Sequence, residues 1–265
     1  MKLSIITVNY NNSDGLQRTI NSVIEQTWHD FEWIIIDGGS ADGSKELIEQ
    51  NKDSFSYWCS ESDNGIYHAM NKGISQANGD YLLFLNSGDS LFDKDVLHKF
   101  SQLNLDADII AGQVVRGDNG KLIRIYDDDV FIQIFKGTLN HQGSFIRKSL
   151  FDNNRYDENL KVVSDWKFWI ESIVWNNASV CYTDLVVAIQ DMTGISHTVP
   201  NDERERVLDT FFPPRLQKEL NDYVRLRSSV YVVRSNYLLV HSPICYRIGR
   251  RFLALLMKMA RYIGK

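Results

Sequence analysis

Residues 3–100 alternate between short apolar segments and amphipathic segments, and this alternation limits the possible folds more than any other feature. The apolar segments are rich in β-branched residues and predict strands at 3–8, 31–36, 55–60 and 81–85. Apolar residues at helical spacing predict helices at 15–26, 44–51, 66–76 and 96–100. Strands and helices that alternate at this spacing favour a parallel sheet with right-handed crossovers. We therefore predict an α/β fold.

Each predicted strand ends in a polar or glycine-rich loop. The four loops are residues 7–12, 37–42, 60–65 and 86–89. Parallel strands bring their carboxyl ends to one edge of the sheet, and ligands of open α/β sheets bind at that edge. The sequence therefore predicts a binding site built from these four loops.

The second half of the chain is less regular. Three strands are predicted to form an antiparallel extension, with a hairpin turn at residues 118–120: 108–115, 122–125 and 143–147. A helix at 166–174 and a strand at 180–189 follow. Long charged helical segments begin near residue 201, so we predict a domain of residues 1–200 and a helical C-terminal extension of residues 201–265.

Composition narrows the functional class. The formal net charge of −5 argues against a nucleic-acid-binding protein. Three cysteines without C-x-x-C spacing indicate reduced thiols and a cytoplasmic location. No apolar stretch is long enough for a membrane-spanning helix. Residues 244–263 instead combine aliphatic and basic residues, and two interpretations stay open: peripheral contact with the inner face of the membrane, or packing as a C-terminal or dimerisation helix.

Two of the loops carry groups suited to a phosphorylated ligand. In the loop that begins at Asp37, glycines allow close backbone approach, and the Asp37 carboxylate can accept a hydrogen bond from a base or ribose. In the loop Asn86-Ser87-Gly88-Asp89, the Asp89 carboxylate suits a divalent cation that itself holds a phosphate. The alternative is that both loops are ordinary strand-to-helix turns whose polar residues cap helices.

The segment 63–73 places polar side chains on one helical face. Asn71 and Lys72 follow Tyr67 by four and five positions, on the neighbouring turn. Lys72 is a candidate for a phosphate contact and Asn71 for orienting that phosphate. The alternative is an ordinary solvent-exposed helix face.

Five motifs in this order resemble glycosyltransferase family 2, and most closely its bacterial surface-polysaccharide branch. The motifs are Thr7-Val8-Asn9-Tyr10-Asn11, the octapeptide at 37–44, Asp63-Asn64-Gly65-Ile66-Tyr67, Asn71-Lys72-Gly73 and the hexapeptide at 84–89. The resemblance covers residues 3–200. It implies a GT-A fold and inverting transfer of a sugar from a nucleotide-sugar donor, with a UDP-sugar favoured. It also implies an Mg²⁺ or Mn²⁺ cofactor and a glycan or lipid-linked acceptor in cell-surface polysaccharide synthesis.

The resemblance also assigns site residues. Those assigned to the nucleotide-sugar site are Thr7, Asn9, Asp37, Asp63, Asn71, Lys72, Asn86 and Ser87, and those assigned to the acceptor side are His141 and Gln142. Asp89 is the metal ligand, in a loop that departs from the family's commoner Asp-Ser-Asp-Asp form. Asp165, which opens the helix predicted at 166–174, is the general base, and its alternative role is to cap that helix.

Two other functional classes remain as alternatives. One is a nucleotidyltransferase, although the loop 7–12 lacks the glycines and lysine that such an enzyme needs. The other is an inactive nucleotide-sugar-binding or scaffold protein, which the single carboxylate of the loop 86–89 suggests.

Overall fold

The structure is a computed structural model that describes residues 2–123, 130–194 and 202–228. The chain divides into two compact units, residues 1–208 and 209–265. The basic amphipathic segment predicted at 244–263 lies outside the described residues. In the parts that the structure describes, no helix is long and apolar enough to cross a membrane.

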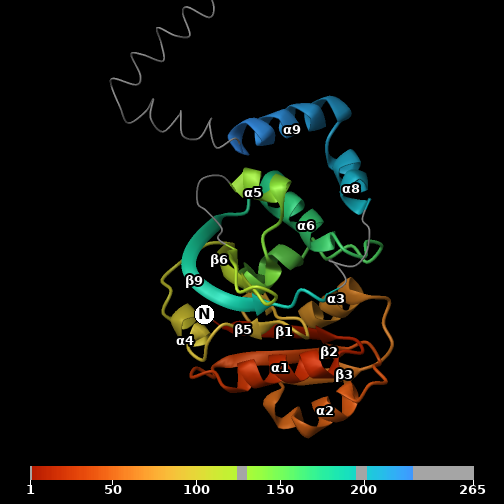
Figure 1. The fold of residues 1–265 in the computed structure, drawn as a ribbon, viewed down its shortest axis with the longest axis vertical. Coiled ribbons are helices and arrows are strands. Elements are labelled where there is room, and N and C mark those ends of the chain that lie inside the picture. The colour runs from red at the N-terminus through yellow and green to blue at the C-terminus, as the bar shows by residue number, and fades with distance from the viewer. Residues whose placement is uncertain (1, 124–129, 195–201, 229–265) are drawn as a thin grey trace, which may run out of the picture. The chain divides into compact units, whose positions relative to one another are not determined.

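The first unit is built on a mixed sheet with helices on both faces (Figure 1). Nine strands of the described residues form this sheet, in the order β3-β2-β1-β4-β8-β6-β9-β5, and β7 pairs with β6. The first four strands in chain order are β1 (Leu3–Asn9), β2 (Phe31–Asp37), β3 (Tyr57–Ser60) and β4 (Tyr81–Phe84). They are mutually parallel, which confirms the predicted α/β sheet.

Four helices connect these strands and follow them, close to the predicted positions. They are α1 (Ser13–Ile24), α2 (Ser44–Gln50), α3 (Ile66–Gln76) and α4 (Val96–Ser101). Strand alternation divides the core between the two faces of the sheet. Ile5 and Trp33 belong to a buried cluster with Leu16 of α1 and Ile48 of α2. On the opposite face α3 packs so closely that a β-carbon on Gly73 would lie 2.4 Å from Ile6 Cγ2.

The second half of the sheet has mixed directions. The antiparallel extension is confirmed, since β6 (Ile109–Arg116) pairs antiparallel with both β7 (Leu122–Ile123) and β8 (Ser144–Arg147). The long strand β9 (Val180–Gln190) then runs parallel to β6, a pairing that the sequence pattern did not reveal. The short strand β5 (Ser90–Leu91) pairs antiparallel with the end of β9, and this contact brings residues 86–91 beside residues 188–191.

Short helices lie between the strands in the second half of the first unit. The helix α5 (Val130–Lys136) was not predicted. The helix predicted at 166–174 is α6 (Ser164–Trp169), which continues as a π-helical turn, Ile170–Trp175. The indole nitrogens of Trp166 and Trp169 donate hydrogen bonds to the carbonyl oxygens of Ile134 and Leu139, at 2.7 and 2.9 Å. These bonds fix the start of α6, where Asp165 lies.

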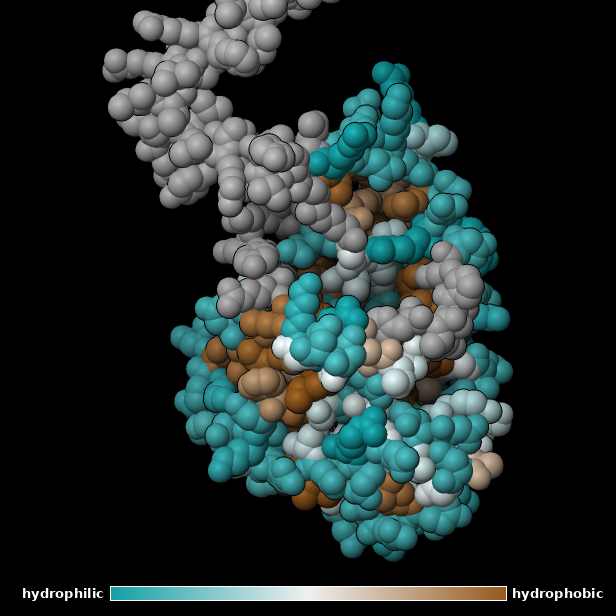
Figure 2. All heavy atoms as spheres, viewed as in Figure 1, coloured by the Kyte–Doolittle hydropathy of each residue, from teal (hydrophilic) through white to brown (hydrophobic). Residues whose placement is uncertain are grey.

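The first unit extends eight residues beyond the predicted boundary at residue 200. The helix α8 (Glu203–Phe211) begins on this unit, where the Glu203 carboxylate accepts hydrogen bonds from the backbone N–H groups of Lys161 and Val162. The Arg204 guanidinium lies 4.3 Å from the centre of the Trp166 ring. The second unit contains α9 (Pro214–Ser228) among its described residues. On the face shown in Figure 2, most surface side chains of the first unit are hydrophilic and apolar ones appear in patches between them.

Candidate active site

The loop after β2 is organised by the Asp37 carboxylate. Its oxygens accept hydrogen bonds from Asn9 Nδ2 at 2.7 Å, the Ser40 amide at 3.0 Å, and the hydroxyls of Ser40 and Ser60, both at 2.6 Å. Burial raises the pKa of Asp37, but these hydrogen bonds outweigh it and hold the pKa below its usual value. Asp37 is therefore a buried carboxylate that joins the ends of β1, β2 and β3.

Tyr10 lies beside this loop and was not among the predicted site residues. Tyr10 is 66% exposed, which is unusual for an aromatic residue of the first unit. A β-carbon on Gly38 would lie 3.2 Å from the Tyr10 ring and 2.8 Å from Asp63 Oδ2, so Gly38 leaves room for both side chains. An exposed aromatic ring beside a glycine and a carboxylate is suited to stacking against another planar ring. The sequence indicates only that Tyr10 lies in the polar loop 7–12.

Thr7 and Asn9 take different positions at the end of β1. Thr7 is fully buried, and its hydroxyl accepts a hydrogen bond from the Trp33 indole at 3.1 Å, so it stabilises the core beneath the loop. Asn9 donates to Asp37, while its Oδ1 atom is buried and has no hydrogen-bond partner. Both residues are buried, and the contacts of Thr7 and Asn9 with a nucleotide stay predictions.

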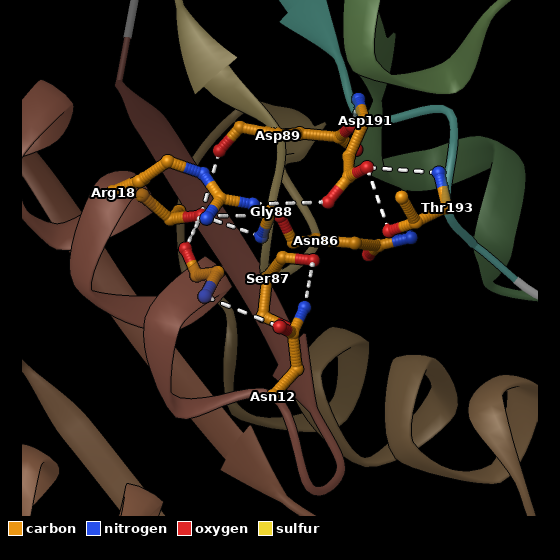
Figure 3. Close-up of polar contacts among 10 residues, drawn as sticks. Asn12, Arg18, Asn86, Ser87, Gly88, Asp89, Asp191 and Thr193 are labelled. Carbon is orange, nitrogen blue, oxygen red and sulfur yellow. Dashed lines mark hydrogen bonds and ion pairs between the residues drawn. The ribbon is translucent and has the colours of Figure 1, made fainter.

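The loop 86–89 is tied to α1. Asn12 Nδ2 donates to the backbone oxygen of Ser87 at 3.2 Å and to its hydroxyl at 3.3 Å (Figure 3). The Thr19 hydroxyl donates to the backbone oxygen of Asp89 at 2.6 Å and accepts from the Gly88 amide at 3.0 Å. Two parallel strand ends are thereby joined, as the predicted convergence of the loops requires.

Asp89 is a buried carboxylate that faces the end of β9. One of its oxygens accepts a hydrogen bond from the Asp191 amide at 2.8 Å. Burial raises the pKa of Asp89 to about 6, and the nearby His141 opposes that rise. Asp191 lies against Gly88 and pairs with Arg18 at 3.2 Å (Figure 3). Asp191 was not predicted, because it follows a different strand, about a hundred residues along the chain.

Asp165 lies at the start of α6, where its carboxylate contacts Trp166, Tyr67 and His141. The Trp166 amide donates to Oδ1 at 2.8 Å. The Tyr67 hydroxyl lies 3.2 Å from the same oxygen and shares its single proton with the Val162 carbonyl oxygen, which is closer at 2.7 Å. His141 Nδ1 lies 3.2 Å from Oδ2. The Asp165 side chain remains 14% exposed, so it is oriented by the protein without being closed off from solvent. Asp165 lies in the first turn of α6, whose N-cap is Val163, and its role as the general base stays a prediction.

His141 connects Asp165 to the loop 86–89. Its second ring nitrogen, Nε2, lies 3.3 Å from Asn86 Nδ2. Burial lowers the pKa of His141, but the carboxylates of Asp165 and Asp89 outweigh burial and raise it above its ordinary value. The structure therefore brings together Asn86, Asp89, His141 and Asp165, which lie far apart in the sequence. Gln142, predicted beside His141, is buried.

Asn71 and Lys72 lie apart from this group. The Asn71 side chain donates to the Tyr156 carbonyl and to Glu158 Oε1, at 2.9 and 2.8 Å, and accepts from the Tyr156 amide at 3.1 Å. Lys72 pairs with Glu61 at 2.6 Å. Both line a surface pocket of about 360 Å³. Their predicted role in donor binding is untested, and the contacts seen give Asn71 a structural role in holding the segment 156–158.

The oxygen atoms near the loop 86–89 fit a divalent cation of the kind that prefers oxygen ligands. Asn86 Oδ1 is buried without a hydrogen-bond partner, so a cation bound there would displace no donor of the protein. Asp89 adds a carboxylate. No group of three or more histidine, cysteine or acidic side chains among the described residues forms a protein-only metal site. Such a cation would need phosphate and water oxygens to complete its coordination.

Solved structures with the same fold are glycosyltransferases. S. aureus TarS, residues 1–349 in complex with UDP-GlcNAc, has a TM-score of 0.68 and 16% identity, over 91% of this chain and 76% of that chain. The mannosyltransferase PcManGT from Pyrobaculum calidifontis, in complex with GDP-Man and Mn²⁺, has a TM-score of 0.58 and 14% identity, over 96% of this chain and 80% of that chain. The predicted GT-A fold is confirmed.

Sequence relatives agree with this fold. A PGL/p-HBAD biosynthesis glycosyltransferase from Mycobacterium tuberculosis is 31% identical over 209 residues, which are 76% of this chain and 81% of the relative. A cholesterol galactosyltransferase from Borreliella burgdorferi is 33% identical over 115 residues, 42% of this chain and 32% of the relative. The family model "Glycosyl transferase family 2" matches residues 4–160, more than half of the chain. The chain belongs to glycosyltransferase family 2.

Proposed function

We propose that this glycosyltransferase inverts the anomeric centre and uses Asp165 as its general base. The observation that supports this role is the geometry of Asp165. Its carboxylate contacts Tyr67, Trp166 and His141, and its side chain is partly open to solvent. A carboxylate in this state can accept a proton from an acceptor hydroxyl. The acceptor oxygen then forms a bond to the anomeric carbon as the bond to the diphosphate oxygen breaks.

The proposed donor is a nucleoside diphosphate sugar. Tyr10 offers an exposed ring for base stacking, and Asn9 and Asp63 provide polar groups beside it. The TarS and PcManGT structures contain UDP-GlcNAc and GDP-Man, so donors of both base types are candidates. Asn86 Oδ1 and Asp89 would hold Mg²⁺ or Mn²⁺ together with the diphosphate. When bound, that cation would stabilise the charge of the departing diphosphate.

The proposed acceptor is a hydroxyl group of a glycan or of a lipid-linked molecule. A galactosyltransferase that acts on cholesterol is among the partial relatives, and the longer relative takes part in PGL/p-HBAD biosynthesis. A lipid-linked acceptor is consistent with the predicted peripheral membrane contact of residues 244–263. Association of two copies through these residues is the competing proposal.

The first experiment identifies the donor and its metal requirement. Thermal unfolding is measured with UDP, GDP, dTDP and CDP, each with Mg²⁺, Mn²⁺ or EDTA. A ligand at one hundred times its dissociation constant stabilises the native state by about 2.7 kcal/mol. A shift with one nucleotide that EDTA abolishes supports the cation site at Asn86 and Asp89. A shift that is equal in EDTA contradicts that site but retains the donor proposal.

The second experiment tests the base. Asp165→Asn keeps the size and the hydrogen-bond acceptor of the side chain but removes its basicity, so turnover should fall by about 10²- to 10⁴-fold with nucleotide binding unchanged. The exposed Asp152, which takes no part in the site contacts described above, provides the control Asp152→Asn. Near-normal turnover by Asp165→Asn would exclude Asp165 as the base. Nucleotide binding without turnover by the wild-type protein, under any metal, would favour the inactive scaffold.

A further inference from the structure

The ring of His141 is placed between the two halves of the proposed active site. It lies in a 3-10 turn, His141–Gly143, that leads into β8, and its side chain is 18% exposed. Nδ1 is 3.2 Å from Asp165 Oδ2, and Nε2 is 3.3 Å from Asn86 Nδ2. A single imidazole thus contacts the residue proposed as base and the first residue of the loop 86–89.

These two contacts specify where the ring proton lies. The Asp165 carboxylate can only accept a hydrogen bond, so the proton belongs on Nδ1. A neutral ring then has its lone pair on Nε2, and the Asn86 amide nitrogen, which can only donate, faces that lone pair. A neutral ring with its proton on Nδ1 satisfies both contacts. The tautomer with its proton on Nε2 satisfies neither.

The same geometry determines how the Asn86 amide is turned. With Nδ2 directed at His141, Oδ1 is the end of the amide that is left buried without a partner. If the amide were reversed, Oδ1 would face the Nε2 lone pair and the NH₂ group would take the position of the free oxygen. His141 therefore keeps an acceptor oxygen, in place of a donor NH₂, at the position proposed for the cation or the donor diphosphate.

We propose that His141 is a positioning residue that couples the two halves of the site, orienting the Asp165 carboxylate through Nδ1 and the Asn86 carbonyl oxygen through Nε2. This inference rests on the proposed role of Asp165 as the base. It differs from the acceptor-side role that the sequence suggests, because both ring nitrogens are already used within the protein. The imidazole acts through its neighbours and does not need to touch either substrate.

Two conservative variants separate the two contacts. The amide nitrogen of asparagine can replace Nδ1, so His141→Asn should keep the bond to Asp165 and lose the contact with Asn86. The amide oxygen of glutamine can replace the Nε2 lone pair, so His141→Gln should keep the contact with Asn86 and lose the bond to Asp165. His141→Ala loses both contacts and serves as the reference.

Binding and turnover are then measured for each variant. Binding is titrated with UDP and Mn²⁺ by calorimetry, or with the nucleotide that gives the largest thermal shift. Turnover is followed as hydrolysis of UDP-GlcNAc or GDP-mannose, whichever the wild type hydrolyses. His141→Gln should lower kcat by about 100-fold, the effect of misplacing a catalytic group by about 1 Å, and leave the nucleotide dissociation constant unchanged. His141→Asn should weaken nucleotide binding by about tenfold and retain most of kcat. Equal effects of both variants on binding and turnover, or no effect of either, would overturn the proposal.

A spectroscopic measurement tests the contacts without using activity. The ¹⁵N shifts of the imidazole nitrogens at pH 8 distinguish the two neutral tautomers and the charged ring, and loss of the signal in His141→Gln assigns it. The neighbouring carboxylates favour the charged ring, whereas the Asn86 nitrogen disfavours it. A neutral ring protonated on Nδ1 supports the proposal, and Asp165→Ala should remove that preference. A ring protonated on Nε2, or on both nitrogens, overturns it. If the expected tautomer is found while Asp165→Asn stays active, the contacts are right and the assignment of the base is wrong.

Discussion

Substitution of Gly88 by alanine should destabilise the protein through two separable effects. Gly88 has φ of +103°, a backbone conformation that side chains disfavour by about 1–3 kcal/mol. An added β-carbon would also lie 2.3 Å from Asp191 Oδ2 and 3.0 Å from Asp191 Cβ. A contact this short forces the Asp191 side chain to move. Backbone strain and displacement of Asp191 therefore add together.

The cost of displacing Asp191 follows from its contacts. Its carboxylate accepts hydrogen bonds from the amide and the hydroxyl of Thr193, both at 2.8 Å, and pairs with Arg18. Each of the two Thr193 bonds contributes about 0.5–1.5 kcal/mol. The Arg18 side chain is largely exposed, so that ion pair contributes less than about 1 kcal/mol. Backbone strain and the two Thr193 bonds together predict a cost of about 2–6 kcal/mol for Gly88→Ala.

The matched control is Gly43→Ala. Gly43 has φ of +94°, and no atom lies within 4 Å of the position of an added β-carbon. This variant should show the backbone strain alone, so Gly88→Ala should cost about 1–3 kcal/mol more, the loss estimated for the Asp191 contacts. Urea unfolding followed by tryptophan fluorescence gives both free energies of unfolding. Adding Asp191→Ala to Gly88→Ala removes the close contact, so the double variant should lose less stability than the sum of the two single variants. Equal costs for Gly88→Ala and Gly43→Ala would refute the proposed close contact with Asp191.

Three further substitutions test residues whose contacts the structure defines. Asn71→Ala removes three hydrogen bonds to the segment that contains Tyr156 and should lower the free energy of unfolding by about 2–4 kcal/mol. Lys72→Ala removes only a surface ion pair with Glu61 and should lower it by less than about 1 kcal/mol. Thermal unfolding of both variants compares the two costs. The lowered pKa of Asp37 means that its carboxylate stabilises the fold above the unfolded-state pKa of 3.8 and that this contribution is lost as pH falls further. Asp37→Asn should therefore be less stable than wild type at pH 7, with a difference that shrinks below about pH 4, and a difference independent of pH would contradict the hydrogen-bonded carboxylate.

Local sequence patterns were sufficient to predict the first half of the sheet. Apolar runs and helical periodicity located β1 to β4 and α1 to α4, because each of these elements is specified by its own residues. Right-handed parallel connections then required the loops after β1, β2 and β4 to meet, and the contacts of Asp37 and Ser87 show that they do. The start of α6 at Asp165 was equally local.

Contacts between distant segments could not be predicted in the same way. The position of Asp191 beside Gly88 depends on β5 pairing with the end of β9, and β5 has only two residues. The role of Asn71 depends on Tyr156, 85 residues later. The burial of Thr7 was predictable in principle. Thr7 has the same strand parity as Ile5, so its side chain points to the same buried face of the sheet.

The hydrogen bonds that each polar group already makes indicate which groups can add most to the binding free energy of a ligand. The Asp37 carboxylate already accepts four hydrogen bonds, so a base can bond to it only if a serine hydroxyl of the loop turns away. Asn9 Oδ1 and Asn86 Oδ1 are buried and have no donor. Both oxygens are closed to solvent in this structure, so a ligand group reaches them only when the loops move apart. The bond that then forms breaks no existing one and removes the cost of an unsatisfied buried acceptor. Asn9 ends β1, and Asn86 follows the neighbouring strand β4. The binding free energy of the donor should therefore come from these two asparagines more than from Asp37, whose role is to hold the strand ends together.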